Sequence, residues 1–284
     1  MLLKCFLFCS VLLSAFVLSA LSSYAGLPVG TEAYDDLEYL ELKGLLPSAI
    51  LSTKPISRRE MRRLLREART GLPRHTRSAP SSSVPMLLKR LENRFDTESG
   101  RHFNSSVYAK ALYSENAPEF SGVNNNGDGP GAGFNARLGA RLEGNVGGIS
   151  LYLNPELRAG EGTATGELVE GYAEFELGPV EIVAGREAMW WGPGAHGALL
   201  ISNNAAPLDL VRATTTHPAP LPWILSPLGL FKPTFFLARL EENRDFPNAN
   251  LLGMRLDFKP TPRFRFALSR VFMFGGEGRG SRTG

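Results

Sequence analysis

The chain has 284 residues, of which 43% are hydrophobic and 21% charged, a balance typical of a folded protein rather than a disordered one. Its 31 basic and 28 acidic residues give a net charge of +3, so it lacks the strongly basic character that general nucleic-acid binding requires. Its length suffices for one large all-β domain or for two smaller domains.

The first 25 residues have the pattern of a cleaved signal peptide. Lys4 precedes the apolar run CFLFCSVLLSAFVLSAL, and residues 23–25 form a small-residue cleavage site. A membrane anchor is the alternative, but the run is shorter than the roughly 20 residues that a spanning helix needs. We therefore expect an exported protein. The two cysteines, Cys5 and Cys9, leave with the signal, so the mature chain has no thiol for a disulfide, a zinc site or catalysis.

Residues 26–100 show helical spacing, and we expect a small helical bundle there. A first helix is predicted to end at Gly44, which stands where a C-cap would be. Ser57 and Glu60 form a capping box at the start of a second helix. A Ser- and Pro-rich linker over 74–85 leads to a third helix. The residues expected to face the bundle core are Tyr34, Leu37, Leu40, Met61, Leu64, Leu65, Ala68, Leu88, Leu91 and Phe95.

Arginines occupy the opposite face of the second helix. We interpret this face as solvated, with contact to anionic lipid or polysaccharide as the alternative. The residues of this face are Arg58, Arg62, Arg66 and Arg69.

From Phe103 the hydrophobic period changes from near 3.6 to 2, which predicts strands. Apolar side chains alternate with charged ones in GFNARLGARLEGN, LLGMRLDFKP and RFRFALSR. A soluble sandwich would show the same alternation, with its apolar face in the core. The nine predicted strands cover residues 103–114, 133–143, 149–158, 168–177, 180–188, 209–216, 230–240, 251–259 and 263–272.

The connections favour a membrane barrel over a sandwich. Each strand is about as long as a tilted membrane strand of roughly 9–11 residues. Long links take turns with short ones, as external loops and periplasmic turns do in an outer-membrane barrel. Charged residues would then face the lumen and apolar ones the lipid. The long links are 115–132, 159–167, 189–208 and 241–250, the short ones 144–148, 178–179 and 260–262, and the Pro-rich link 217–229 is an exception on the short side.

The strand count predicts an incomplete barrel. Bacterial barrels use even numbers of strands and pair the last with the first, whereas nine are predicted before the polar tail GGEGRGSRTG. We expect a mainly β fold, a transmembrane antiparallel β-barrel truncated at its C-terminus and preceded by the helical bundle. The expected division is a signal peptide over 1–25, a periplasmic bundle over 26–100 and the N-terminal portion of the barrel over 101–284.

The stretch GREAMWWGPGAHGALLISNNAAPLD, from Gly185 to Asp209, is the candidate binding loop. Indole rings stack on the apolar faces of sugars, while Asn and Arg orient hydroxyls and acidic groups by hydrogen bonds. The alternative for the indoles is the aromatic girdle at the lipid interface. The predicted polysaccharide-binding residues are Trp190, Trp191, Arg186, Asn203, Asn204 and Arg212.

Other motifs give weak support to metal binding or catalysis. NNNGDG at residues 124–129 is similar to a calcium loop, but Asn135 stands where such a loop needs a glutamate. Glu241 and Asp245 lie among arginines, and we interpret this cluster as ion pairs rather than as the carboxylate pair of a glycosidase. We expect no metal site, no catalytic residue and no cofactor.

Three blocks resemble the Wzi-type capsule assembly proteins: GREAMWWGPGAHGALLISNNAAPLDLVR, FFLARLEENRDFPNANLLGMRLDFKPTPRFRFALSR and FMFGGEGR. The stretch YDDLEYLELKGLLPSAILSTKPISRREMRRLLREA looks like that family's leading helical segment. This resemblance, over roughly residues 28–279, implies an outer-membrane β-barrel with a periplasmic helical bundle. It also implies lectin-like attachment of capsular polysaccharide to the cell surface, without enzymatic activity. The implied partners are capsular or extracellular polysaccharide and outer-membrane lipid.

Two other functions stay open at the level of sequence. A diffusion channel would use lumen residues such as Arg141, Arg255 and Asp257 to line a water path. A polysaccharide-modifying enzyme would use Glu241 or Asp245.

Overall fold

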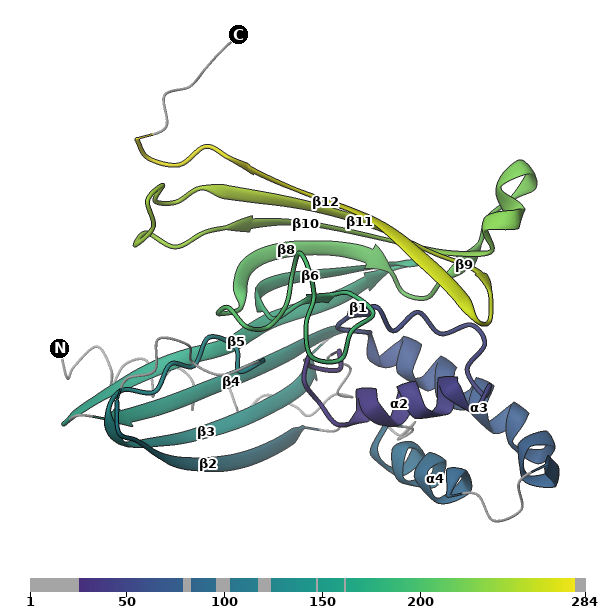
Figure 1. The fold of residues 1–284 in the computed structure, drawn as a ribbon, viewed down its shortest axis with the longest axis horizontal. Helices are drawn as coiled ribbons and strands as arrows, with labels where there is room; N and C mark the ends of the chain where they lie inside the picture. Colours follow the sequence, from purple (N-terminus) through teal and green to yellow (C-terminus); the bar gives the residue numbers. More distant parts are fainter. Residues whose placement is uncertain are drawn as a thin grey trace, which may run out of the picture.

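The computed structural model describes residues 26–78, 83–95, 103–116, 124–146, 148–160 and 162–278. The predicted signal peptide over 1–25 lies outside these ranges, as do residues 279–284 of the polar tail. A helical unit is seated at one end of a curved antiparallel sheet (Figure 1). Over the described ranges, no helix is both long and apolar enough to cross a bilayer.

Three helices make up the helical unit: α2 (Ala33–Leu42), α3 (Arg58–Ser78) and α4 (Val84–Phe95). Gly44 follows α2 with a φ of 75°, the left-handed conformation that commonly ends a helix. At the start of α3 the Ser57 hydroxyl accepts a hydrogen bond from the backbone N–H of Glu60, at 3.1 Å. The helix continues through Pro73 to Ser78 and takes up the first part of the predicted linker.

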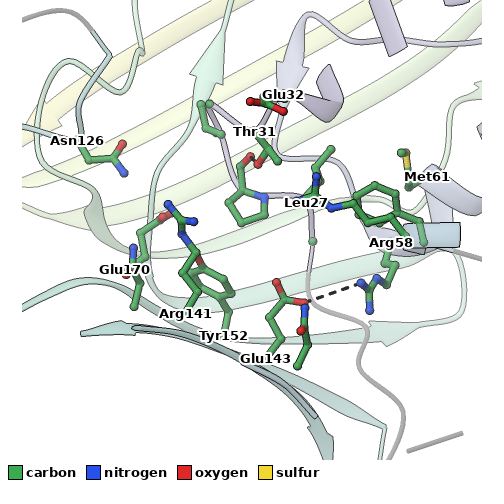
Figure 2. Close-up of a pocket in the computed structure, with 18 residues that line it drawn as sticks. Leu27, Thr31, Glu32, Arg58, Met61, Asn126, Arg141, Glu143, Tyr152 and Glu170 are labelled. Carbon is green, nitrogen blue, oxygen red and sulfur yellow. Dashed lines mark hydrogen bonds and ion pairs between the residues drawn. The ribbon is translucent and has the colours of Figure 1, made fainter. Parts of the chain in front are cut away.

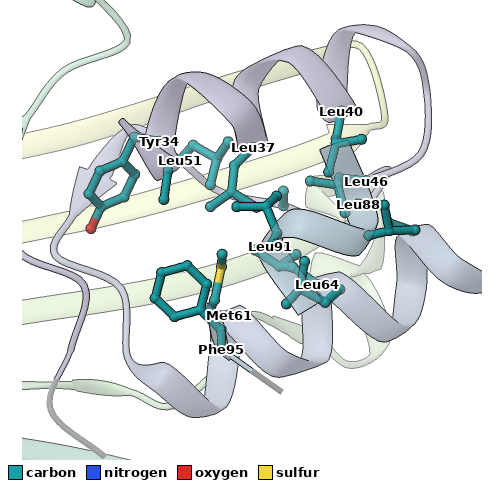
Figure 3. Packing of buried hydrophobic residues seen from close by; sticks show 14 of the residues in the cluster. Tyr34, Leu37, Leu40, Leu46, Leu51, Met61, Leu64, Leu88, Leu91 and Phe95 are labelled. Carbon is teal, nitrogen blue, oxygen red and sulfur yellow. The ribbon is translucent and has the colours of Figure 1, made fainter. Parts of the chain in front are cut away.

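A single apolar core joins the three helices (Figure 3). The predicted core residues are all buried there, which confirms the helical spacing of the sequence. Leu45, Leu46 and Leu51, in the connection between α2 and α3, complete this core. The predicted members are Tyr34, Leu37, Leu40, Met61, Leu64, Leu65, Ala68, Leu88, Leu91 and Phe95.

Nine long strands form one antiparallel sheet in the order β12-β11-β10-β8-β6-β5-β4-β3-β2, so each strand pairs with its neighbours in sequence. Every one of the nine predicted strands is present, and the mainly β fold is confirmed. Three short strands were not predicted: β1 (Thr53–Lys54), β7 (Trp190–Trp191) and β9 (Ala219–Pro220). The long strands are β2 (Asn104–Ser114), β3 (Gly133–Val146), β4 (Ile149–Gly160), β5 (Thr163–Leu177), β6 (Val180–Glu187), β8 (Leu208–Thr215), β10 (Leu230–Arg239), β11 (Asn250–Thr261) and β12 (Phe264–Phe274).

The two faces of the sheet differ in polarity as the alternation predicts. On β3, Arg137 is 5% exposed on the concave face while its neighbour Leu138 is 55% exposed on the convex face. The concave face carries buried ions on all the central strands. Exposed apolar residues of the convex face include Phe134, Leu138, Leu157, Val211, Phe235, Leu237 and Leu268.

The two ends of the sheet differ in their connections. Tight turns join β3 to β4, β5 to β6 and β11 to β12 at the end where the helices sit, which we call the helical end. The links 115–132, 188–207 and 240–249 leave the opposite end, which we call the loop end. The predicted long link over 159–167 is wrong. β4 and β5 extend to Gly160 and Thr163, because Gly162 adopts a φ of 76° that permits a tight turn and the Thr-rich start of β5 favours strand.

Ion pairs connect the helical unit to the helical end of the sheet. Arg59 of α3 pairs with Glu176 of β5 at 2.7 Å, and Arg58 lies 3.8 Å from Glu143 of β3. At β11, the ammonium group of Lys259 forms an ion pair with the carboxylate of Glu41, which belongs to α2, at 2.7 Å. Arg58 therefore contacts the sheet, and the interpretation of its face as solvated is wrong there, because helix docking brings a strand carboxylate within reach. Arg66 and Arg69 of the same face are exposed as predicted.

A buried network joins the chain ahead of α3 to β11. Ser52 and Thr53 donate hydrogen bonds to the two carboxylate oxygens of Asp257, at 3.0 and 2.6 Å, and Arg255 pairs with the same carboxylate at 2.8 Å. All four residues are buried. The Asp257 carboxylate thus accepts hydrogen bonds from both hydroxyls and from the guanidinium, and it links the helical unit to the concave face of the sheet.

We expect Asp257→Asn to lower the free energy of unfolding by about 1–3 kcal/mol. The amide removes the charge that Arg255 needs and leaves at least one buried donor unsatisfied. Urea unfolding in detergent micelles measures the loss. Asp209→Asn is the control, because Asp209 pairs with an arginine at the surface and its loss should cost less than about 1 kcal/mol. Equal effects of the two variants would contradict the role given to Asp257.

Candidate functional site

The predicted binding loop turns into the concave side of the sheet. Its residues Trp190 and Trp191 form β7, which pairs with β1 of the helical unit, Trp191 opposite Thr53. The backbone N–H of Trp191 donates to the Ile201 carbonyl, and that of Gly192 donates to the Ser52 carbonyl, both at 2.9 Å. The link 188–207, which leaves the loop end, therefore pairs with β1 of the helical unit on the concave side of the sheet.

Both indoles are packing residues in this arrangement. Trp190 and Trp191 are 3% and 2% exposed. The Trp191 ring meets Phe236 edge-on, with centroids 5.3 Å apart, and the Trp190 Nε1–H donates to the Gly192 carbonyl at 3.1 Å. At this burial neither ring is open to solvent, and the ring contacts hold the loop against the sheet.

The two predicted arginines have opposite environments. Arg212 is buried, with a bidentate contact to Glu187 at 2.7 and 2.8 Å and a third hydrogen bond to Glu181 at 2.9 Å. Arg186 makes the same bidentate contact with Asp209, both at 2.7 Å, at the surface near the loop end. Of the two, only Arg186 reaches solvent, and it does so on the convex face.

Asn203 and Asn204 hold two loop-end links together. Asn203 donates through Nδ2 to the Asn124 carbonyl at 3.1 Å and accepts the Asn126 N–H at 2.7 Å on its own carbonyl. The Asn204 side chain accepts the Asn124 N–H at 2.7 Å. We call this contact, between residues 124–128 and 201–206, the loop clasp.

The clasp requires a close backbone approach. Gly127 adopts a φ of 70°, and a Cβ there would lie 2.6 Å from the Ala206 nitrogen, so only glycine fits. Asp128 extends the clasp to the sheet through Arg137, at 3.1 Å. Asn203 is buried in the clasp, whereas Asn204 is exposed on it. The sequence predicted a polar external loop here but not its partner, because the contact joins residues about 80 positions apart.

A polar cavity of 350 Å³ lies below the clasp, between residues 26–32, the start of α3 and the concave face of β3–β5. Figure 2 shows Arg141, Tyr152 and Glu170 directed toward the stretch that contains Thr31. The Arg141 guanidinium lies 4.7 Å from the centroid of the Tyr108 ring. The volume of this cavity falls within the roughly 300–1,000 Å³ of ligand pockets, although the cavity is less apolar than most of them.

Arg58 closes one side of this cavity. Burial lowers the pKa of its guanidinium, and the carboxylate of Glu143 opposes that shift. Tyr152 and Asn154 also line the cavity, and neither was among the residues predicted from the sequence. Period-2 spacing places both on the concave face with Arg141 of the neighbouring strand, and this signal could have found them.

The acidic cluster of the β10–β11 link forms an ion pair, as the sequence predicts. The Arg244 guanidinium forms an ion pair with the Glu241 carboxylate at 2.6 Å, and both side chains are about half exposed.

A family model described as capsule assembly protein Wzi matches residues 103–284, more than half of the chain. The chain belongs to the Wzi family. A Klebsiella pneumoniae relative, described as an uncharacterized 55.8 kDa protein in the cps region, is 24% identical over 267 residues, covering 92% of this chain and 49% of the relative. The resemblance predicted from the sequence blocks is thereby confirmed.

A solved Wzi structure has the same fold. It is described as an outer membrane protein involved in group 1 capsule assembly in Escherichia coli and as a carbohydrate-binding β-barrel. The TM-score is 0.67 at 19% sequence identity, over 92% of this chain and 55% of the solved chain. The Wzi-family chain described above thus spans about half the length of the relatives that it matches.

Proposed function

We propose that this Wzi-family protein binds capsular or extracellular polysaccharide at the outer membrane and attaches it to the cell surface, as a lectin-like protein without catalytic activity. In this proposal residues 1–25 direct export, the helical unit within 26–100 lies in the periplasm, and residues 101–284 form a portion of the barrel. The observation that carries the proposal is a sheet with ionic residues on its concave face and apolar residues on its convex face, whose loop end carries a polar clasp.

The polarity of the sheet supports the membrane location. Arg212, Arg255 and Lys259 are buried on the concave face, each in contact with a carboxylate. Charges on a lipid-facing surface would be costly, whereas charges inside a barrel can pair with one another. The convex face, in contrast, exposes leucine, valine and phenylalanine over most of its strands. Lipid is the solvent that suits such a surface.

The loop end supports binding of a hydrated polymer. Asn204 is exposed there, and Arg186 is partly exposed at the loop-end margin of the convex face, on a strand and a link that are held by buried contacts. Guanidinium and amide groups are suited to acidic groups and hydroxyls of a polysaccharide. We assign the glycan contacts to these two residues. Trp190, Trp191, Asn203 and Arg212 complete the proposed site by positioning the loop that carries the contacts.

The concave face disfavours the diffusion-channel alternative. Two of the residues that would line a water path, Arg255 and Asp257, are buried and bonded to Thr53 of the helical unit. A protein filled in this way should pass little current in a planar bilayer, and a large steady conductance would favour a channel instead.

The double variant Arg186→Ala/Asn204→Ala tests the binding site. We expect it to weaken binding to purified capsular polysaccharide by about tenfold or more, because hydrogen bonds from a charged group contribute about 1.5–3 kcal/mol each. Co-sedimentation of the detergent-solubilised protein with the polysaccharide measures the loss. Arg244→Ala, which removes another exposed arginine at the loop end, is the matched control and should bind normally.

Each outcome of this comparison has a clear meaning. Unchanged binding by the double variant would overturn the assignment of Arg186 and Asn204. An equal loss in Arg244→Ala would show that net charge alone attracts the polymer. The free energy of unfolding should stay within about 1–2 kcal/mol of the parent value for both variants, because a surface ion pair contributes little and Asn204→Ala removes one exposed hydrogen bond.

A further inference from the structure

One connection at the helical end is unlike the others. The β8–β10 link leaves β8 at Thr216 and returns at Gly229, whereas the described links β3–β4, β5–β6 and β11–β12 are tight turns. Residues 218–229 of this link, which we call the proline tip, contain β9 and the short helix η1 (Trp223–Leu228). Figure 1 shows the tip projecting beyond the strand ends, on the opposite side of the sheet from α2, α3 and α4.

The proline tip is the most exposed apolar part of this end. Trp223 and Ile224 are 92% and 91% exposed, and Leu225 is half exposed. The sequence from Pro218 to Phe231 contains no aspartate, glutamate, lysine or arginine. Contiguous exposed apolar side chains of this kind mark a surface that meets another molecule or a membrane.

The tip has a defined shape. Backbone hydrogen bonds join Leu225 to Pro222 at 3.2 Å, Gly229 to Ser226 at 3.0 Å and Leu221 to Gly229 at 3.1 Å. Trp223 has a φ of 54°, a left-handed conformation that residues with side chains rarely adopt. Such conformations persist where the surrounding structure imposes them, and they cluster at functional positions. The backbone conformation of the tip therefore fixes the position of the Trp223 indole.

An aromatic row continues from the tip across the convex face. Phe231, two residues after the tip, lies 5.2 Å from Phe258 of β11, measured between ring centroids. Phe258 in turn stacks on Phe266 of β12 at 5.0 Å, and Phe264 follows at 6.0 Å from Phe266. Three adjacent strands thus carry phenylalanines at the helical end of the face that we assign to lipid.

We propose that the proline tip inserts Trp223 and Ile224 into the periplasm-side interface of the lipid bilayer, where it extends the aromatic row beyond the strand ends. The inference rests on the proposed function, since it requires the convex face to lie in lipid. Tryptophan suits this zone, because its ring is apolar while its N–H can still reach water or headgroups. The absence of charge in the tip and its continuity with the convex face favour lipid over a protein partner.

Depth-dependent fluorescence quenching tests the insertion. The full chain is folded into phosphatidylcholine vesicles that contain lipids brominated either near the headgroup end or near the methyl end of the acyl chain. Trp190 and Trp191 are buried in the protein, so the difference between the parent protein and Trp223→Phe isolates the Trp223 signal. We expect that signal to lose more intensity with bromine near the headgroup end, and its emission to shift to shorter wavelength than in detergent-free buffer.

A second variant separates this proposal from the one on which it rests. Phe235→Trp in the Trp223→Phe background places an indole in the middle of the convex face. Quenching of this reporter without quenching of Trp223 would overturn the tip proposal while the barrel remains embedded. Access of aqueous acrylamide to Trp223 in that case would indicate a surface for a protein partner. Absence of quenching at both positions would overturn the membrane location itself.

Discussion

Replacing Arg212 by methionine is expected to destabilise the folded protein by about 3–5 kcal/mol, because it leaves two buried carboxylates without their cation. Glu187 and Glu181 are 1% and 2% exposed, and Arg212 contacts both of them. Methionine keeps most of the volume, so the loss reports the charge rather than a cavity. The midpoint of urea unfolding in detergent micelles measures it.

Arg186→Met is the matched control for this experiment. Arg186 and Arg212 lie on the paired strands β6 and β8, and each holds a carboxylate with two parallel hydrogen bonds. They differ in burial, since the Arg186 side chain is 37% exposed and that of Arg212 is 4% exposed. An exposed pair contributes less than about 1 kcal/mol. Similar midpoints for the two variants would show that the interior ion cluster does not stabilise the fold.

Trp191→Ala is expected to lower the free energy of unfolding by about 3–5 kcal/mol, the usual cost of deleting a buried tryptophan side chain. The ring fills the space among Phe236, Leu210 and Met189, and water or a void would take its place. The variant should also weaken polysaccharide binding, because the anchored loop carries Asn204. Chemical unfolding and co-sedimentation with the polysaccharide measure the two effects.

Trp191→Phe distinguishes an anchor from a ligand contact. Phenylalanine retains an aromatic ring against Phe236 and should recover a large part of both the stability and the binding. A Trp191→Ala variant that keeps the free energy of unfolding of the parent protein but no longer binds polysaccharide would contradict the anchoring role. That result would mean that the ring becomes accessible to the sugar.

Local patterns in the sequence predicted most of the fold. Ser57, Gly44 and the spacing of Leu37 and Leu40 identify helices from interactions within a few residues. Alternation such as Arg137 beside Leu138 identifies both the strands and the polarity of their faces, because successive strand side chains point to opposite sides. The β4–β5 link was the exception, since its turn depends on Gly162 and on how far the two strands pair.

The candidate site was only partly predictable. The sequence places Trp190, Trp191 and the two asparagines in one loop, and their composition is that of a surface that binds sugars. Burial of the indoles depends on β1 reaching the interior from the helical unit, a contact between residues more than 130 positions apart. Chain spacing contains no information about such a contact.

The sequence by itself determined which residues form strands and which face of each strand is apolar, because these properties depend on neighbours along the chain. Alternation and strand pairing put Arg186 and Arg212 on opposite faces, but only the tertiary structure decided that the concave face is covered, which makes Arg212 an interior ion. Packing of the helical unit and of the inward loop against the concave face removes water from Arg212, whereas Arg186 points to the convex face with Asp209 and keeps contact with solvent. The charge that each arginine offers to a ligand therefore follows from the assembled fold.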